Sequence, residues 1–476
     1  MLKVRENSID LSFGVVRRLW CVEKPIWHTG YPRGCGHILF QPLSISNTST
    51  QKTHLQRQPV NKAFNAPLDS SLLDLDEKKR ANLLTWRGQF SPEFIENLLV
   101  AYAESNDVVL DPFCGSGTLL YECGRLGLEG VGVELNPAAY NLSKVYEFMN
   151  IDLYQRKKHL RAFHLILSER FDFSTLLAAP REVAYEENEI IEFVEQLSSG
   201  TETEDQFLSI LCHCLITIID FDGFAVKNTR IEKCYLKLEK LVLELPRAER
   251  NVNVFNYDCR NLPLESDSVD FVLTSPPYIN VFNYHQNYRK STELLGWDVL
   301  NVAKSEIGSN RANRGNRFLT VVQYVNDLAQ CLNEIYRVLK SRGKCLFVVG
   351  HESTVLGCRF FNAEIIRDLA SELGEFDIVQ NQSRFFKNKF GANIREDLIH
   401  MVSKDNGSCS PEILQKVCFK ISSRHLKRAL NGAPEKNRKL LESAIEKSAL
   451  VFGTTIYKGL EGNDNRAFSS TSLEEA

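Results

Sequence analysis

The hydrophobic pattern of this chain follows two different periods. Short, continuous apolar runs are typical of strands that are covered on both faces of a parallel sheet, and they occur at 108–110, 271–273 and 343–350. Apolar positions with helical spacing occur at 119–126, 318–340 and 363–373. Strands that alternate with helices in this way predict an α/β protein built on a mostly parallel sheet.

The alternation is interrupted between about 141 and 247. Helices are predicted there at 153–173, 182–197 and 204–219, followed by a basic segment with Lys227, Arg230, Lys233, Lys237 and Lys240. A mostly helical insertion of this length exceeds what a connection between two strands needs. We also expect a helix at 72–86, two final strands at 376–379 and 397–402, and a basic helical segment beyond 403.

Composition and charge narrow the picture further. The 476 residues are 43% hydrophobic, which is enough apolar material for one large domain or for a core domain carrying insertions. The net charge is -3, so the chain has no global positive field, and any contact with nucleic acid must come from local basic patches. No apolar run of eighteen residues and no secretory signal pattern occurs, which predicts a soluble, cytoplasmic protein without a membrane partner.

The thirteen cysteines are scattered and odd in number, as expected of reduced thiols. Cys212, His213 and Cys214 form the tightest Cys/His cluster, but they lie in an apolar run that predicts a buried helix. We therefore expect no metal site.

A glycine-rich turn follows the strand at 108–110. It has the sequence Asp-Pro-Phe-Cys-Gly-Ser-Gly-Thr from Asp111 to Thr118, and its glycines allow the backbone to approach a ligand closely. It lacks both the Lys-Ser/Thr pair of a P-loop and the full G-x-G-x-x-G of dinucleotide folds, so cofactor phosphates are not its target. Glu134 ends the next strand roughly twenty residues later, where a carboxylate commonly binds ribose hydroxyls.

A second turn follows the buried strand at 271–273. Pro276 and Pro277 end this strand, so carbonyl groups project at its carboxyl end without ladder partners. The Ser275 hydroxyl and the Pro276 carbonyl can accept hydrogen bonds from an amine, and Tyr278 offers a flat face on which a base can stack.

The two turns together resemble the motifs of the DNA amino-methyltransferases, which methylate cytosine N4 or adenine N6 from S-adenosylmethionine. The resemblance covers about 86–136 and 251–402. It implies a Rossmann-like class I methyltransferase fold, in which a seven-stranded mixed sheet has its last strand antiparallel, with the helical insertion added. It also implies that Ser275, Pro276, Pro277 and Tyr278 are catalytic. Serine at the first of these positions leans toward cytosine N4 in this family, whereas Asp or Asn leans toward adenine N6.

The resemblance also assigns residues to S-adenosylmethionine and to DNA. Those expected at the cofactor are Phe90, Ser91, Pro92, Asp111, Pro112, Phe113, Gly115, Ser116, Gly117, Thr118, Glu134 and Asp258, the last as the acceptor of the adenine amino group. Those expected at double-stranded DNA are His285, Arg289, Lys304, Arg311, Arg314 and Arg317, the last four in a loop rich in Gly and Asn with net positive charge. The sequence also predicts that Ser91 is the N-cap of a helix whose first residue is Pro92.

The expected organisation has five parts. These are an N-terminal extension (1–74), a cofactor-binding half (75–140), the insertion (141–247), a catalytic half (248–404) and a basic helical segment with a polar tail (405–476). The insertion is expected to recognise the DNA target, to cover the cofactor, or to be purely structural. A cognate restriction endonuclease is a further expected partner. Adenine N6 methylation, RNA amine methylation and a non-catalytic cofactor-binding subunit remain as alternatives to cytosine N4 methylation.

Overall fold

The computed structural model describes residues 62–75, 79–170, 183–202, 205–221, 226–279, 283–308, 313, 315–388, 391–405 and 407–458, with the side chain of Arg170 left out. All of them lie in one unit, Arg57–Ala476. Most of the predicted N-terminal extension and the end of the polar tail lie outside the described residues. Among the described residues, no helix combines the length and apolar composition needed to cross a membrane.

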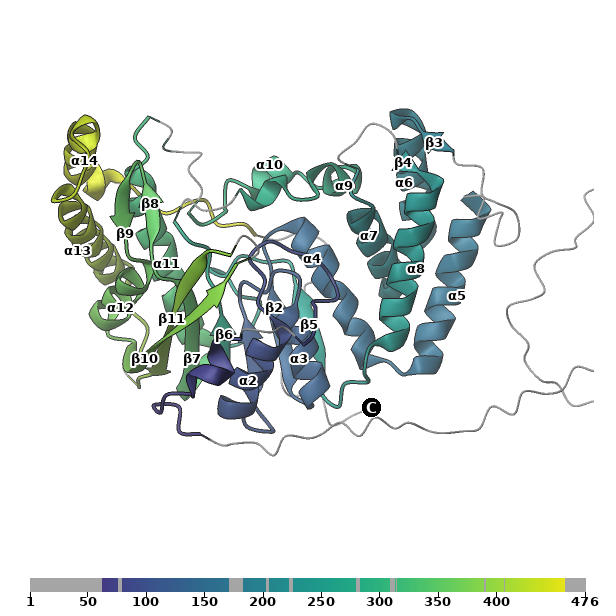
Figure 1. The fold of residues 1–476 in the computed structure, drawn as a ribbon, viewed down its shortest axis with the longest axis horizontal. Coiled ribbons are helices and arrows are strands. Elements are labelled where there is room, and N and C mark those ends of the chain that lie inside the picture. Colours follow the sequence, from purple (N-terminus) through teal and green to yellow (C-terminus); the bar gives the residue numbers. More distant parts are fainter. Residues whose placement is uncertain are drawn as a thin grey trace, which may run out of the picture. The chain divides into compact units, whose positions relative to one another are not determined.

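The centre of the fold is a seven-stranded sheet (Figure 1). Its strands stand in the order β10-β11-β7-β6-β1-β2-β5. Neighbours from β7 to β5 are parallel, whereas β11 is antiparallel to both β7 and β10. The strands are β1 Val108–Asp111, β2 Glu129–Val133, β5 Val252–Phe255, β6 Val269–Thr274, β7 Leu339–Gly350, β10 Phe376–Lys387 and β11 Asn393–Ser403. The predicted class I methyltransferase fold with an antiparallel last strand is confirmed.

Helices cover both faces of the sheet because alternate strand side chains point to opposite faces. Val109 and Phe271 pack against α2 (Pro92–Tyr102) and α3 (Thr118–Leu126). Leu110 and Val272 pack on the other side, against α11 (Leu319–Val338) and α12 (Asn362–Leu373). This two-sided burial explains why the strands appear in the sequence as continuous apolar runs.

The insertion forms a helical layer beyond β5, the edge strand of the sheet (Figure 1). Its main helices are α5 Leu153–Arg170, α6 Glu187–Thr201, α7 Gln206–Ile219 and α8 Asn228–Glu244. Cys212 and Cys214 are fully buried in α7, and burial raises their thiol pKa values to about 11 and about 12. The apolar cluster of the insertion also includes Val252 and Val254 of β5 and α4 (Pro137–Ser143), so the insertion shares a core with the sheet.

Smaller elements complete the described chain. They are α1 Ser70–Leu73, η1 Lys144–Asn150, β3 Ala184–Tyr185, β4 Val226–Lys227, η2 Tyr284–Gln286, α9 Arg289–Leu294, α10 Val299–Val302, β8 Ser353–Val355, β9 Cys358–Phe360, α13 Pro411–Leu430, α14 Glu435–Lys447 and η3 Ser448–Leu450. The predicted basic helical segment corresponds to α13 and α14. After η3, residues 451–458 form neither helix nor strand.

Two predicted elements differ from the structure. The helix expected at 72–86 is wrong, because α1 ends at Leu73 and no helix follows in the described part of 74–91. Side chains there bond to backbone instead: Asn82 donates to the Phe90 carbonyl (2.8 Å) and Gln89 donates to the Leu84 carbonyl (3.1 Å). The final strands are also longer than expected, because β10 and β11 continue as a paired hairpin whose outer part has mixed exposure.

Candidate active site

One cavity of about 420 Å³ lies at the carboxyl ends of four neighbouring strands. The segments that follow β1, β2, β5 and β6 all contribute to its wall. The predicted site residues that line it are Phe90, Asp111, Pro112, Phe113, Gly115, Ser116, Thr118, Glu134, Asp258, Ser275, Pro276, Pro277 and Tyr278. The glycine turn and the proline turn therefore share one pocket.

The glycine turn depends on its two glycines. Gly115 and Gly117 have φ values of +54° and +83°, a conformation that residues with a Cβ rarely adopt. A Cβ on Gly117 would also stand 2.7 Å from the Tyr146 ring. Gly117 is the N-cap of α3, and the turn is tied to β2 because the Gly115 N–H donates to the Glu134 carboxylate at 2.7 Å.

Among the described residues, two buried acids in this wall, Asp111 and Glu134, form no ion pair. Asp111 accepts hydrogen bonds from the Thr274 hydroxyl (2.6 Å) and the Phe113 N–H (3.1 Å). Burial raises the pKa of Asp111 to about 7, and burial likewise raises the pKa of Glu134 to about 7. Carboxylates in this environment favour a ligand that brings positive charge.

The proline turn begins directly after β6. The Ser275 hydroxyl lies 3.2 Å from the Tyr278 hydroxyl, and the edge of the Tyr278 ring lies against Gly350, the last residue of β7. Burial raises the pKa of Tyr278, which keeps this phenol neutral. The arrangement places a hydroxyl, a carbonyl and an aromatic ring at one end of the cavity.

Aromatic residues form much of the remaining wall. Trp86 stacks on Tyr284, with ring centroids 6.4 Å apart and an interplanar angle of 15°. On the β10–β11 hairpin, the Arg384 guanidinium pairs with the wall residue Glu396 at 2.6 Å and lies 3.5 Å from the centre of the Phe94 ring. The wall residues that sequence analysis did not assign include Trp86, Arg87, Tyr284, Glu306, Phe386 and Glu396. Those on the β10–β11 hairpin carried no local signal, because only the long-range strand pairing brings them to the cavity.

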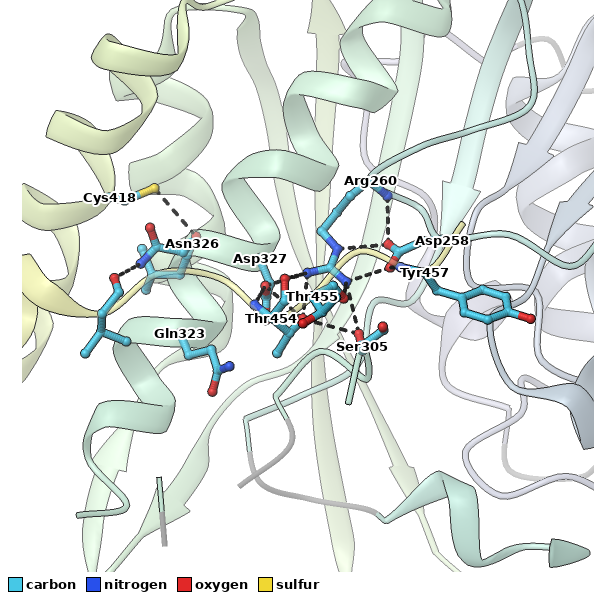
Figure 2. Close-up of polar contacts among 12 residues, drawn as sticks. Asp258, Arg260, Ser305, Gln323, Asn326, Asp327, Cys418, Thr454, Thr455 and Tyr457 are labelled. Atoms are coloured by element: carbon cyan, nitrogen blue, oxygen red, sulfur yellow. Dashed lines mark hydrogen bonds and ion pairs between the residues drawn. The ribbon is translucent and has the colours of Figure 1, made fainter. Parts of the chain in front are cut away.

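Asp258 lines the cavity as expected, but its carboxylate is already occupied (Figure 2). One oxygen accepts from the Arg260 N–H (3.0 Å) and Nε (2.8 Å), and the other accepts from Arg260 Nη2 (2.6 Å) and the Tyr457 N–H (3.2 Å). These four bonds match the four lone-pair sites of a carboxylate. The expected bond to an adenine amino group would have to displace one of them.

The other predicted residues that the structure describes, Gly117 among them, lie outside the cavity wall. Ser91 and Pro92 stand at the N-cap and first position of α2, as the sequence indicated. His285 is buried and pairs with Glu306 at 2.8 Å, and Arg289 pairs with Glu293 at 2.7 Å. Lys304 donates to Asn301, and Arg317 is half-buried with its Nε covered. Arg311 and Arg314 lie outside the described residues. In the described part of the chain, no group of three or more His, Cys, Asp or Glu side chains is placed to hold a metal ion.

Two family profiles match this chain. A DNA methylase profile matches residues 27–145, and a profile for the D12 class N6 adenine-specific DNA methyltransferases matches residues 92–343, which is more than half of the chain. The chain is also similar to curated type II methyltransferases. M.BsoBI of Geobacillus stearothermophilus is 22% identical over 55% of this chain and 61% of its own length. M.AvaI of Nostoc sp. strain PCC 7120 is 20% identical over 61% of this chain and 77% of its own length.

Solved structures are similar at lower identity. An S-adenosylmethionine-dependent methyltransferase from Methanosarcina mazei matches 64% of this chain and 95% of its own chain, with 12% identity and a TM-score of 0.29. The rRNA methyltransferase aviRa from Streptomyces viridochromogenes matches 67% of this chain and 88% of its own, with 12% identity and a TM-score of 0.27.

Proposed function

Because the chain belongs to the D12 class N6 adenine-specific DNA methyltransferase family, we propose that it methylates the exocyclic amine of a base in double-stranded DNA. The cofactor is S-adenosylmethionine, as expected from the sequence. One observation carries the proposal: the glycine turn after β1 and the Ser-Pro-Pro-Tyr turn after β6 line the same cavity. A methyl donor held at the first turn can there meet an amine held at the second.

The cavity suits this cofactor in charge and shape. Asp111 and Glu134 are buried carboxylates whose raised pKa values favour a cationic ligand, and the methionine part of the cofactor carries a sulfonium and an ammonium. Gly115 lines the cavity, and Gly115 and Gly117 give the turn the positive φ values on which its shape depends. We assign Asp111 to the methionine part, Glu134 to the ribose hydroxyls, and Phe90 to packing beside them. The bound cofactor supplies the electrophilic methyl group.

The proline turn would hold the amine for attack. An exocyclic amine is a poor nucleophile because its lone pair is delocalised into the base. The Ser275 hydroxyl and the Pro276 carbonyl can accept its two N–H groups, which shifts electron density toward nitrogen. Tyr278 stacks on the base, which must leave the duplex to reach this cavity. Correct placement of these three groups supplies orientation, one of the larger sources of rate enhancement.

The base is proposed to be cytosine, methylated at N4. Its support is Ser275 at the first motif position, which in the amino-methyltransferases leans toward cytosine N4. Adenine N6 is the second candidate, favoured by the description of the D12 profile. The first experiment is to incubate the protein with unmethylated DNA and labelled cofactor, digest the DNA and identify the nucleoside by mass spectrometry. N4-methylcytosine supports the first candidate and N6-methyladenine the second. Parallel reactions with RNA test the RNA alternative, and methylation of DNA by this chain alone excludes a non-catalytic role.

The role of the proline turn is tested by Ser275→Ala. We expect loss of methyl transfer with cofactor affinity nearly unchanged, because Ser275 is assigned to the amine and not to the cofactor. Ser199→Ala is the matched control, because Ser199 is exposed on α6 and its hydroxyl donates to the Gln196 carbonyl of its own helix. Wild-type activity in Ser275→Ala would show that the Ser275 hydroxyl does not hold the amine.

Contacts with DNA are a further part of the proposal. We propose that Arg289, Lys304 and Arg317 contact phosphates, and that the insertion takes part in target recognition. If Arg317 neutralises one phosphate, Arg317→Gln should reduce the slope of log affinity against log salt by about one; an unchanged slope would exclude the contact. A cognate restriction endonuclease is proposed as a partner on the basis of the type II relatives.

A further inference from the structure

We propose that the C-terminal segment 451–458 positions the wall of the cofactor site from outside the cavity, through its contacts with Arg260. This inference rests on the proposed function and assigns a new role to residues far from both sequence motifs. Figure 2 shows the segment passing over Arg260, Asp258 and Asp327, with Thr454 beside them and the ring of Tyr457 pointing away.

Arg260 is the centre of the contact. Its side chain is fully buried, and its guanidinium pairs with Asp258 at 2.6 Å and with Asp327 of α11 at 2.7 Å. The C-terminal segment supplies three further acceptors: the Thr454 hydroxyl (2.6 Å), the Thr454 carbonyl (3.1 Å) and the Thr455 carbonyl (3.1 Å). The guanidinium donates from all three of its nitrogens, and the segment accounts for much of that bonding.

The segment also donates to the two acids. The Thr454 N–H donates to Asp327 at 2.7 Å, and the Tyr457 N–H donates to Asp258 at 3.2 Å. Two carboxylates around one guanidinium leave an excess of negative charge in a buried place, and burial raises the pKa of Asp327 to about 7. Backbone N–H groups that point at these carboxylates therefore help to keep the cluster intact.

The fit of the segment on α11 is close. A Cβ on Gly453 would stand 2.7 Å from Asp327 Oδ1 and 2.7 Å from Gln330 Nε2. Asn326 of α11 also donates to the Val451 carbonyl at 3.3 Å. The segment thus lies in a defined place between residues that are more than 120 positions away in the sequence.

Arg260 connects this contact to the cavity wall. On one side it holds Asp258, which lines the cavity together with Tyr257 and Cys259. On the other side Arg260 Nη2 donates to the Ser305 carbonyl at 3.1 Å, directly before the wall residues Glu306 and Ile307. The guanidinium therefore joins two wall segments that come from different parts of the chain.

The C-terminal residues themselves do not line the cavity. Their effect must pass through Arg260, so Thr454 is a positioning residue and not a cofactor ligand. Because the four acceptor sites of Asp258 are filled, Asp258 is assigned to holding Arg260 and the Tyr457 N–H, and not to receiving an adenine amino group.

The test is Thr454→Val, which keeps the backbone bonds and the side-chain volume but removes the hydroxyl. The hydroxyl accepts from Arg260 (2.6 Å) and lies within donating distance of the Asp327 carboxylate (3.1 Å) and the Ser305 carbonyl (3.3 Å). Losing it should weaken binding of S-adenosylmethionine about tenfold or more, measured by equilibrium dialysis without DNA. In turnover, the KM for the cofactor should rise while kcat changes little. Thr454→Ser, which keeps the hydroxyl, should restore tight binding. Thr354→Val is the matched control, because Thr354 is exposed on β8, far along the chain from this contact.

A second measurement needs no variant. If the docked segment favours the cofactor, then the cofactor must favour the docked segment by the same factor. Amide hydrogen exchange at Thr454 and Tyr457 in the wild-type chain should therefore slow when S-adenosylmethionine is added. This result stands even if Thr454→Val proves too unstable to purify.

The outcomes separate the two proposals. If the wild-type chain binds the cofactor, and Thr454→Val binds it equally well or the exchange rates do not change, the positioning role is overturned while the proposed function stands. If the wild-type chain binds the cofactor but methylates no DNA, the proposed function is overturned and the positioning role is judged by the affinities alone. A wild-type chain that binds no S-adenosylmethionine overturns both.

Discussion

Gly350→Ala is the sharpest test of how the aromatic ring of the proline turn is positioned. Gly350 ends β7, and a Cβ built there would stand 2.8 Å from Cε2 of Tyr278, 3.2 Å from Cδ2 and 3.4 Å from Cζ. Carbon atoms in contact are normally about 3.5–4.0 Å apart, so the ring must move by roughly 1 Å to accept the methyl group. The φ of Gly350 is outside the left-handed region, so alanine adds no backbone strain of that kind.

The displacement should act on catalysis more than on cofactor binding. The Tyr278 hydroxyl lies 3.2 Å from the Ser275 hydroxyl, so a shifted ring disturbs both the stacking face and the proposed amine acceptor. A misplacement of about 1 Å can cost on the order of 100-fold in rate, and we expect a loss of kcat of that size. Cofactor affinity should change less than about threefold, since the wall formed by the glycine turn is untouched.

The assay compares kcat, cofactor affinity and thermal unfolding of Gly350→Ala with those of Gly432→Ala. Gly432 is a matched control, because its φ is also outside the left-handed region and a Cβ there would meet nothing within 4 Å. Wild-type kcat in Gly350→Ala would refute the view that this glycine sets the ring position. Equal losses of kcat and of folded protein would point to general destabilisation instead.

Two further predictions concern the cofactor end of the cavity. Gly117→Ala should weaken cofactor binding about tenfold or more, measured by equilibrium dialysis. Gly374→Ala is the control, because Gly374 has a similar positive φ but open space around its Cβ, and it should leave the affinity unchanged. Equal affinity in both variants would contradict the role of the turn. Because Asp111 and Glu134 have pKa values of about 7 without ligand, a cationic cofactor must displace their protons below that pH. Cofactor affinity should therefore fall as the pH is lowered from 8 to 6, by up to about tenfold per pH unit for each group, and Asp111→Asn should flatten the profile.

The sheet was predictable from the sequence because its signals are local. Strands β1 and β6 are buried on both faces, which makes each a continuous apolar run in the sequence. The glycine turn and the proline turn follow these runs directly, so the strand and its turn can be recognised together. The same reasoning placed Asp111 and Ser275 at the ends of strands, and the structure brings both to one cavity.

The features that the sequence did not predict depend on contacts that no local pattern reports. The sequence at 72–86 predicts a helix, but the side chains of Asn82 and Gln89 bond to backbone carbonyls there and Trp86 packs beside Gly115. Asp258 lines the cavity, but its partners Arg260 and the Tyr457 N–H cannot be inferred from spacing. The Asp258–Tyr457 bond spans 199 positions, and no periodicity reports a contact of that kind.

The charges of the cavity also bear on how a catalytic cycle could end. Most other acids in the wall already have partners: Asp258 pairs with Arg260, Glu306 with His285 and Glu396 with Arg384. Asp111 and Glu134 are the ones held mainly by hydrogen bonds from backbone N–H and hydroxyl groups, so their interaction with a ligand depends on the charge of that ligand. Methyl transfer turns a sulfonium into a neutral thioether, so these carboxylates attract the product less strongly than the substrate. If Asp111 and Glu134 bind the cofactor as proposed, the same acids that favour its entry therefore hold the spent form less tightly.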